Sequence, residues 1–115
     1  MKKIIILTIC LLCLACDKTS SKSSPSSELE NLMSNNEYII VDVRTKEEYQ
    51  TSHLKDGLNI PYDTIDSNTK LDKDKLILVY CKSGNRSRIA MKTLTDLGYN
   101  VYDLGAFDSI PLEKE

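Results

Sequence analysis

The hydrophobic pattern after residue 37 is a series of short apolar runs separated by polar, helix-forming stretches. Tyr38–Val43 and Leu76–Tyr80 are rich in β-branched and other apolar residues on both alternating faces. Such runs are typical of strands buried on both sides of a parallel sheet. Two shorter strands are predicted at Leu58–Ile60, which Pro61 stops, and at Val101–Leu104.

Helical patterns lie before and between these strands. Ser27 and Thr45 each stand three residues before a glutamate, the spacing of a capping box that opens a helix. Apolar residues at intervals of three and four predict a longer helix that Gly98 ends. The predicted helices cover about residues 27–36, 45–49 and 86–97.

Strands that alternate with helices predict βαβ units. The expected fold is a three-layer α/β fold, in which a small parallel sheet of four to five strands carries helices on both faces. Ligands of such sheets bind beyond the carboxyl ends of the strands. The first candidate site is therefore the loop after Leu76–Tyr80, the most apolar strand, and this loop starts at Cys81.

The N-terminus has the layout of an export signal. Two lysines precede the uncharged run Ile4–Leu14, which is too short to span a bilayer as a helix. Ala15 followed by Cys16 and a polar stretch resembles the lipobox of bacterial lipoproteins, which implies cleavage before Cys16 and a lipid on its thiol. Lipoboxes favour Leu three positions before the cysteine, where this chain has Cys13. An ordinary signal peptide or an uncleaved anchor is the alternative.

We therefore expect a lipoprotein signal peptide at residues 1–15, a lipid-anchored tether at 16–27 and the folded domain at 28–115. The tether has six serines between residues 17 and 27 and no apolar residue, so it has nothing to bury. This organisation predicts an exported protein held on the cell membrane or the outer membrane by its lipid, with its domain outside the cytoplasm.

Composition narrows the function further. The 115 residues include 15 Lys and Arg and 17 Asp and Glu, a net charge of −2 that becomes −4 (13 against 17) when the two N-terminal lysines leave. A nucleic-acid partner is not expected, because it would require a basic face. Of four cysteines only Cys81 would remain a free thiol, so no disulfide is expected. One histidine and one thiol cannot form a closed ligand set, so no metal is expected, and the sequence has no Gly-rich nucleotide loop, so no cofactor is expected.

The loop that starts at Cys81 has the features of a reactive thiol site. Gly84 permits a backbone with positive φ, and Lys82, Arg86 and Arg88 place three positive charges near the thiol. Because these cations and the N–H groups of a helix N-terminus favour a thiolate, we expect Cys81 to be nucleophilic with a lowered pKa. The alternative is a small buried cysteine that merely ends a strand.

The motif Cys81-x-x-Gly84-x-Arg86-Ser87 resembles the active-site loop of single-domain rhodaneses, the thiosulfate sulfurtransferases. The resemblance covers about residues 28–110 and implies a rhodanese-like fold. Three further blocks resemble the same family in the same order: Val41–Arg44 with Glu47-Glu48-Tyr49, His53–Pro61, and Leu97-Gly98-Tyr99 with Asp103-Leu104-Gly105.

The resemblance implies that Cys81 takes sulfane sulfur from a small anionic donor such as thiosulfate, becomes a persulfide and passes the sulfur to cyanide or a thiol. Lys82 and Arg86 would orient the donor, and an ion pair of Asp42 with Arg44 would tie the strand end to the loop. We also expect a monomer. The residues implied in binding the donor or the persulfide are Lys82, Ser83, Gly84, Asn85, Arg86 and Ser87.

Other functions are weighed against this one. A cysteine phosphatase or an arsenate reductase is disfavoured, because those phosphatases place five residues between cysteine and arginine and this chain has four. A non-enzymatic sulfur carrier, redox sensor or partner-binding module stays open. His53 matches a family histidine, but an ionised thiol needs no base, so we expect no catalytic role for it. The tail after Gly105 lacks the second glycine and the tryptophan that are usual in the family. This difference bears on donor specificity more than on the structure of the loop.

Overall fold

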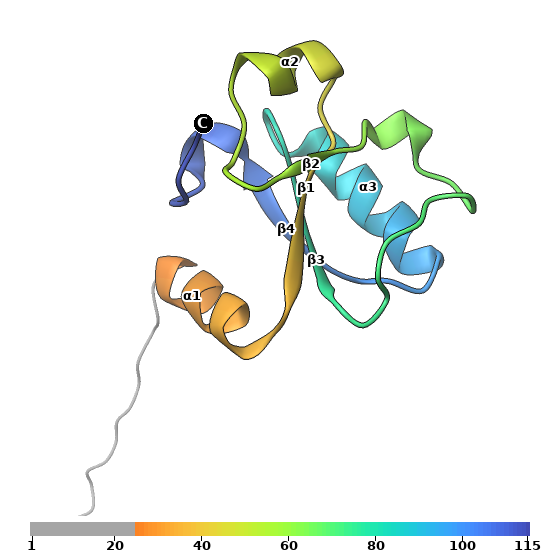
Figure 1. Cartoon of the computed structure of the whole chain (residues 1–115), viewed down its shortest axis with the longest axis horizontal. Coiled ribbons are helices and arrows are strands. Elements are labelled where there is room, and N and C mark those ends of the chain that lie inside the picture. The colour runs from red at the N-terminus through yellow and green to blue at the C-terminus, as the bar shows by residue number, and fades with distance from the viewer. Residues whose placement is uncertain (1–24) are drawn as a thin grey trace, which may run out of the picture.

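The sheet is four-stranded and wholly parallel. A computed structural model describes residues 25–115, and the signal peptide and the lipidation at Cys16 predicted above lie outside these residues. The strands lie in the order β2-β1-β3-β4, as Figure 1 shows. The predicted parallel α/β fold is thereby confirmed. The strands are β1 (Tyr38–Asp42), β2 (Leu58–Asn59), β3 (Leu76–Cys81) and β4 (Asn100–Ala106).

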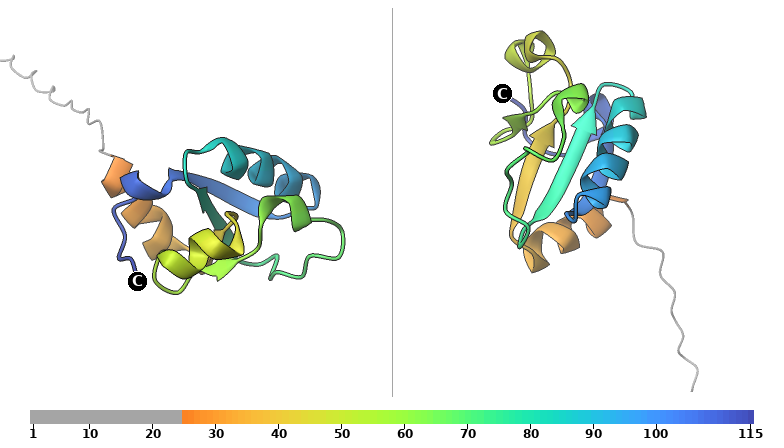
Figure 2. Two further views of the ribbon diagram at one scale, coloured as in Figure 1. Left: turned by 90° about the horizontal axis from the view of Figure 1, so that it is seen from above. Right: turned by 90° about the vertical axis from the view of Figure 1, so that its right-hand side faces the viewer.

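Helices surround the sheet on both faces and at one end. Helix α3 covers one face, while α1 packs against the other face near its lower end (Figures 1 and 2). Helix α2 lies beyond the carboxyl ends of the strands (Figure 1). No helix within residues 25–115 is long and apolar enough to cross a membrane. The helices are α1 (Pro25–Asn35), α2 (Lys46–Thr51) and α3 (Asn85–Asp96), with short 3₁₀ turns η3 (Tyr62–Thr64) and η4 (Phe107–Ser109).

The first helix begins earlier than the sequence pattern predicted. Ser27 was expected to open it, but α1 starts at Pro25 and places Ser27 inside its first turn. Proline is favoured at the first helical position, because its missing N–H is one that the helix could not satisfy. The helix therefore occupies residues 25–27, which we had predicted as the end of the tether.

The central strands are buried on both faces, as their sequences predicted. Alternate residues of β3 face opposite sides, so Cys81 packs with Val79 and the α3 side chains. Its neighbour Tyr80 points to the other face, where Leu78 and Leu32 of α1 lie. The strand alternation thus separates the thiol from the aromatic ring beside it.

A buried carboxylate organises the carboxyl ends of β1 and β3. Asp42 has no exposed surface, and its two oxygens accept hydrogen bonds of 2.7–3.0 Å from the Arg44 guanidinium. The Tyr80 hydroxyl donates to the same carboxylate at 2.8 Å and accepts from the Leu54 N–H at 3.0 Å. Burial raises the pKa of Tyr80, so this hydroxyl stays a donor. A charge can stay buried here because it is paired and hydrogen-bonded.

The same cluster also fixes the segments around it. Arg44 donates to the Ser52 carbonyl at 2.6 Å, and its guanidinium lies 4.4 Å from the centre of the Phe107 ring. The Asn59 side-chain amide donates to the carbonyls of Asp42 and Arg44. Residues from β2, the segment before it and η4 are therefore all fixed around the end of β1.

We predict that Tyr80→Phe lowers the free energy of unfolding by about 2 kcal/mol, because it leaves the Leu54 N–H without a partner in the interior and removes one hydrogen bond from the buried Asp42 carboxylate. Urea denaturation followed by circular dichroism would measure the change. Tyr102→Phe is the matched control, since among residues 25–115 nothing is hydrogen-bonded to the Tyr102 hydroxyl and a loss within about 0.5 kcal/mol is expected. Equal losses in the two variants would contradict the role given to the network.

Candidate active site

Cys81 ends β3 and stands at the mouth of a short strand-to-helix loop. Only residues 82–84 separate it from α3, which starts at Asn85, one residue before the predicted start. Gly84 caps the helix with a φ of +98°, a conformation that a residue with a side chain rarely adopts. This turn bends the chain back so that the first N–H groups of α3 face the sulfur.

The sulfur is buried and surrounded by donors. Its Sγ atom accepts hydrogen bonds from the N–H groups of Gly84 at 3.0 Å and Ser87 at 3.3 Å, and Cys81 has no exposed surface. Burial alone would raise the pKa of the thiol, but hydrogen bonds from the Ser87 hydroxyl and the N–H groups of Ser87, Gly84 and Ser83 outweigh it and lower the pKa. The direction agrees with the sequence-based expectation, and the site favours a thiolate.

Arg86 does not stand free beside the thiol. Its guanidinium makes a two-pronged ion pair with Glu48 of α2, with N–O distances of 2.8 and 3.1 Å. The pair lowers the pKa of Glu48 to about 2, and Glu48 also closes the capping box with Thr45. Sequence reasoning identified Glu48 only as a capping residue, so the partner of Arg86 was missed.

The other residues predicted for the loop differ in how exposed they are to solvent. Lys82 and Ser83 are exposed, and within residues 25–115 Lys82 has neither an ion pair nor a side-chain hydrogen bond. Asn85 is exposed and accepts a hydrogen bond from Arg88 at 3.3 Å. Ser87 is buried, and its single hydroxyl hydrogen can be donated to the Gly84 carbonyl at 3.2 Å or to the Cys81 sulfur. Among residues 25–115, Lys82 and Arg88 are therefore the cations near the thiol that lack an ion pair, and Arg86 is neutralised.

Asp42 and Arg44 form the predicted ion pair but do not touch the loop. In the part of the chain that the structure describes, none of their hydrogen bonds goes to residues 82–87. They lie on the opposite face of the sheet from Cys81, because side chains alternate along the β1 segment, where Val41 and Val43 pack on the Cys81 face. Their link to the site is Tyr80, the residue before Cys81, so they bear on the loop through the strand end.

His53 is part of a contact with the C-terminus. Its ring stacks on Tyr49 with 3.9 Å between centroids, and its Nδ1 lies 2.8 Å from the Tyr49 carbonyl. Its Nε2 lies 3.4 Å from a Glu115 carboxylate oxygen. Both ring nitrogens thus face groups other than the thiol. Within residues 25–115, no three His, Cys, Asp or Glu side chains are placed to hold a metal ion.

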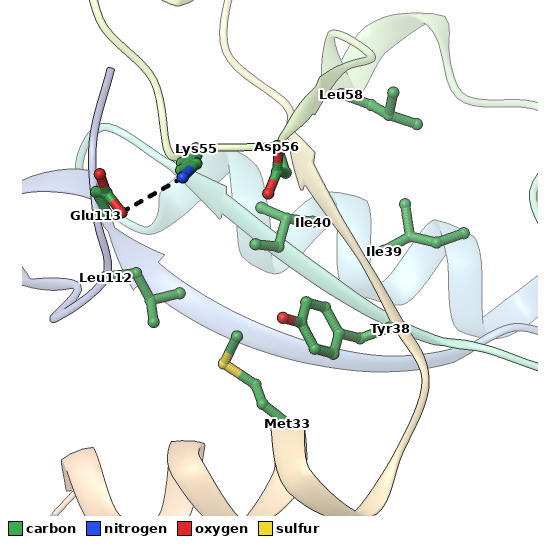
Figure 3. A pocket seen from close by; sticks show the side chains of 9 residues that line it. All are labelled: Met33, Tyr38, Ile39, Ile40, Lys55, Asp56, Leu58, Leu112 and Glu113. Atoms are coloured by element: carbon green, nitrogen blue, oxygen red, sulfur yellow. Dashed lines mark ion pairs between the residues drawn. The ribbon is translucent and has the colours of Figure 1, made fainter.

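A largely apolar hollow lies away from the thiol. It has a volume of about 400 Å³ and opens beside the amino end of β1, where the Lys55–Glu113 ion pair of 3.7 Å stands at its edge (Figure 3). Met33, Tyr38 and Leu112 point into it (Figure 3). The carboxyl ends of the strands, where Cys81 stands, are at the opposite end of the sheet. This hollow therefore contributes nothing to the chemistry of the thiol.

Comparison with known proteins places the chain in a family. The sequence pattern of the Rhodanese-like domain matches residues 26–109. The chain belongs to the rhodanese-like domain family. A solved structure described as rhodanese with anions from E. coli has a TM-score of 0.61 at 30% identity and covers 68% of this chain and 96% of that one. The predicted rhodanese-like fold is thereby confirmed.

Two curated relatives differ in how much of their length matches. Thiosulfate sulfurtransferase PspE of Escherichia coli strain K12 is 32% identical over 78 residues, which is 64% of this chain and 75% of PspE. Adenylyltransferase and sulfurtransferase UBA4 of Meyerozyma guilliermondii is 37% identical over 79 residues, which is 61% of this chain. The match spans only 19% of UBA4, so that relative contains much that this chain does not match.

Ser87→Ala is predicted to raise the pKa of Cys81, because it removes one hydrogen bond to the thiolate and leaves the backbone donors in place. The midpoint of the alkylation rate against pH, measured with iodoacetamide, should move upward toward that of an ordinary thiol. Ser83→Ala is the matched control, since Ser83 acts through its backbone N–H, which alanine keeps. A Ser87→Ala midpoint identical to that of Ser83→Ala would refute this assignment.

We further predict a pH-dependent stability from Glu48. The pKa of Glu48 in the folded protein is about 2, below the ordinary value of 4.5. The ionised carboxylate therefore stabilises the fold fully above pH 4.5, and this stabilisation is lost as the pH falls toward 2. Because both partners are partly exposed, Glu48→Gln should cost about 1 kcal/mol at pH 7 and progressively less below pH 4.5. Urea unfolding at pH 7, 5 and 3 measures this, with the exposed neighbour variant Glu47→Gln as the control. A cost that does not shrink at low pH would show that lost capping, not lost charge, is responsible.

Proposed function

We propose that the protein is a rhodanese-type sulfurtransferase that moves sulfane sulfur through a persulfide on Cys81. The observation that carries this proposal is the buried Cys81 sulfur facing the N–H groups of Gly84 and Ser87 at the start of α3. These donors stabilise an anionic sulfur without a base, so the thiol can be ionised before the donor arrives. The names of relatives such as PspE support the same chemistry.

The reaction has two steps that balance in atoms and electrons. The Cys81 thiolate attacks the outer sulfur of thiosulfate, the sulfur–sulfur bond of the donor breaks, and sulfite leaves with the bonding electrons. Cyanide or a thiolate then attacks the outer sulfur of the persulfide, and Cys81 leaves as a thiolate. The N–H groups that hold the first thiolate also suit the anion of the persulfide, since they face the position where negative charge collects.

The donor-binding cation is Lys82 in this proposal. Lys82 directly follows Cys81 and has no ion pair among the described residues, whereas the charge of Arg86 is balanced by Glu48. Arg86 therefore orders the loop and α2 relative to each other, and it takes part in donor binding only if Glu48 yields its hydrogen bonds. This changes the donor-orienting role that the family resemblance implied for Arg86.

A second candidate function is a sulfur-carrier, redox-sensing or partner-binding module of the cell envelope. The complete burial of Cys81 and the neutralised Arg86 favour it, because both limit access of a free anionic donor. The match to a small part of UBA4 is compatible with a domain that acts beside others. Such a module would accept sulfur from a protein donor and turn over slowly with thiosulfate.

Intact-mass spectrometry of the full-length protein in detergent distinguishes these functions. One added sulfur atom after incubation with thiosulfate, removed again by cyanide and absent in Cys81→Ser, is expected for the sulfurtransferase. Steady-state formation of thiocyanate should accompany it. A persulfide that forms only with a persulfidated protein donor would favour the carrier module, and the absence of any adduct under both conditions would refute sulfur transfer and leave the redox-sensing or partner-binding module.

We also propose that the protein acts as a monomer, tethered outside the cytoplasm by a lipid on Cys16. The arrangement of charged, apolar and small residues before Cys16 supports the lipid anchor. Cys16→Ser should release the protein from sedimented membranes into the soluble fraction or leave its precursor unprocessed. Cys10→Ser, which lies outside the lipobox positions, is the control and should leave the mature protein membrane-bound. Unchanged processing and sedimentation of Cys16→Ser would overturn the anchor.

A further inference from the structure

The ion pair of Arg86 with Glu48 joins α2 to the first turn of α3. The two terminal nitrogens of the Arg86 guanidinium each donate to one Glu48 oxygen, at 2.8 and 3.1 Å. The exposed fractions of the two side chains are 26% and 27%, so small ions can reach the pair. A guanidinium binds carboxylates and other oxyanions with this two-pronged geometry. Glu48 therefore takes up the groups that Arg86 would offer to an anionic donor.

The charge of Arg86 acts on the reactive sulfur as well as on Glu48. Hydrogen bonding to Glu48 is the main cause that raises the pKa of Arg86, burial opposes it, and the charges of Glu48 and the Cys81 sulfur raise it further. Arg86 lies in the first turn of α3, where the Ser87 N–H faces the sulfur. The guanidinium is thus one cation with two anionic neighbours, and a donor anion that approaches Cys81 would be the third.

The Glu48 carboxylate is held in place and stays ionised. Its Oε1 atom accepts hydrogen bonds from the Thr45 N–H at 3.0 Å and from the Thr45 hydroxyl at 3.2 Å. Because the pKa of Glu48 is about 2, the carboxylate carries its full charge near neutral pH. A donor anion must therefore displace two charge-assisted hydrogen bonds before it can bind Arg86 in the same way.

The other cations of the loop cannot replace Arg86 as an ordered binding group. Within residues 25–115, Lys82 and Arg88 have no ion pair, and both are exposed. Exposed charges attract an anion but hold it weakly, because water and salt screen the interaction. An anionic donor is therefore drawn toward the loop, while the guanidinium that interacts with the sulfur is already bound to Glu48.

We propose that Glu48 is a specificity-determining residue, which competes with small anionic donors for Arg86 and so selects against donors of high negative charge. The inference rests on the proposed function. Glu48 lowers the rate with thiosulfate, a dianion, more than the rate with a thiosulfonate, in which an uncharged alkyl group replaces one oxygen anion. With a thiosulfonate, the Cys81 thiolate attacks the outer sulfur, the sulfur–sulfur bond breaks, and a sulfinate leaves with the bonding electrons.

Alkylation of Cys81 tests the effect on anions without any sulfur transfer. Iodoacetate and iodoacetamide are similar in size, but only iodoacetate is charged, and with both the thiolate displaces iodide. Rates are measured on full-length protein by mass spectrometry of the peptide that contains Cys81. Glu48→Gln should raise the ratio of the iodoacetate rate to the iodoacetamide rate by about threefold to fivefold, as for one partly exposed ion pair. Glutamine can keep the capping interaction, and the ratio cancels changes in loop motion or thiol pKa.

Two further variants identify the cause of the change. Glu47→Gln removes the same charge from an exposed neighbouring position of α2 and should leave the ratio nearly unchanged. Glu48→Gln combined with Arg86→Gln should return the ratio to near the wild-type value, because no guanidinium is then left to bind the anion. An equal rise in Glu47→Gln would make overall charge the cause, and a rise that persists in the double variant would make loosening of α2 the cause. Either result overturns the role of Glu48.

Steady-state transfer of sulfur to cyanide tests the same role with donors. In Glu48→Gln the ratio of kcat/KM for thiosulfate to that for methanethiosulfonate should rise by a similar factor, through a lower KM for thiosulfate and a nearly unchanged kcat. If both donors form a persulfide and this ratio does not change, the specificity role is refuted while the sulfurtransferase stands. If no persulfide forms, the proposed function fails, and the alkylation ratio alone decides whether Glu48 controls the approach of anions to Cys81.

Discussion

The buried carboxylate of Asp42 is the interaction on which the geometry of this domain depends. Arg44 and the Tyr80 hydroxyl satisfy it, and the same two groups bind the Ser52 carbonyl and the Leu54 N–H. An unpaired charge at this depth would cost several kcal/mol, so these partners cannot separate independently. The ends of β1 and β3 are thereby held together, and Cys81 starts its loop from a fixed position.

Strand alternation lets one short segment serve two purposes. Tyr80 points to the face that holds the scaffold, while Cys81, the next residue, points to the face that α3 covers. Support and chemistry are thus adjacent along the chain and separated by the thickness of the sheet. Glu48 joins them at the edge, since it caps α2 and also binds Arg86 of the candidate loop.

Much of this arrangement could be predicted from local patterns. The apolar runs located β1 and β3, and the position of Cys81 and Gly84 between a strand and a helix indicated the thiolate site. The pairing of Arg86 with Glu48 could not be predicted in this way, because the two residues are 38 positions apart and only the crossing of α2 over the strand ends brings them together. The start of α1 was misplaced because a proline at the first helical position competes with a capping motif two residues later.

The N–H groups that face the Cys81 sulfur belong to the backbone, and this affects how the site can change through mutation. Almost any side chain at positions 83 and 85 leaves those donors in place, so few substitutions besides those at Cys81 and Gly84 remove the anion site itself. The exposed side chains of the loop, such as Lys82 and Asn85, can be replaced without disturbing the core. Substitutions at such exposed positions can therefore change which molecules the domain binds, while its reactive sulfur stays the same.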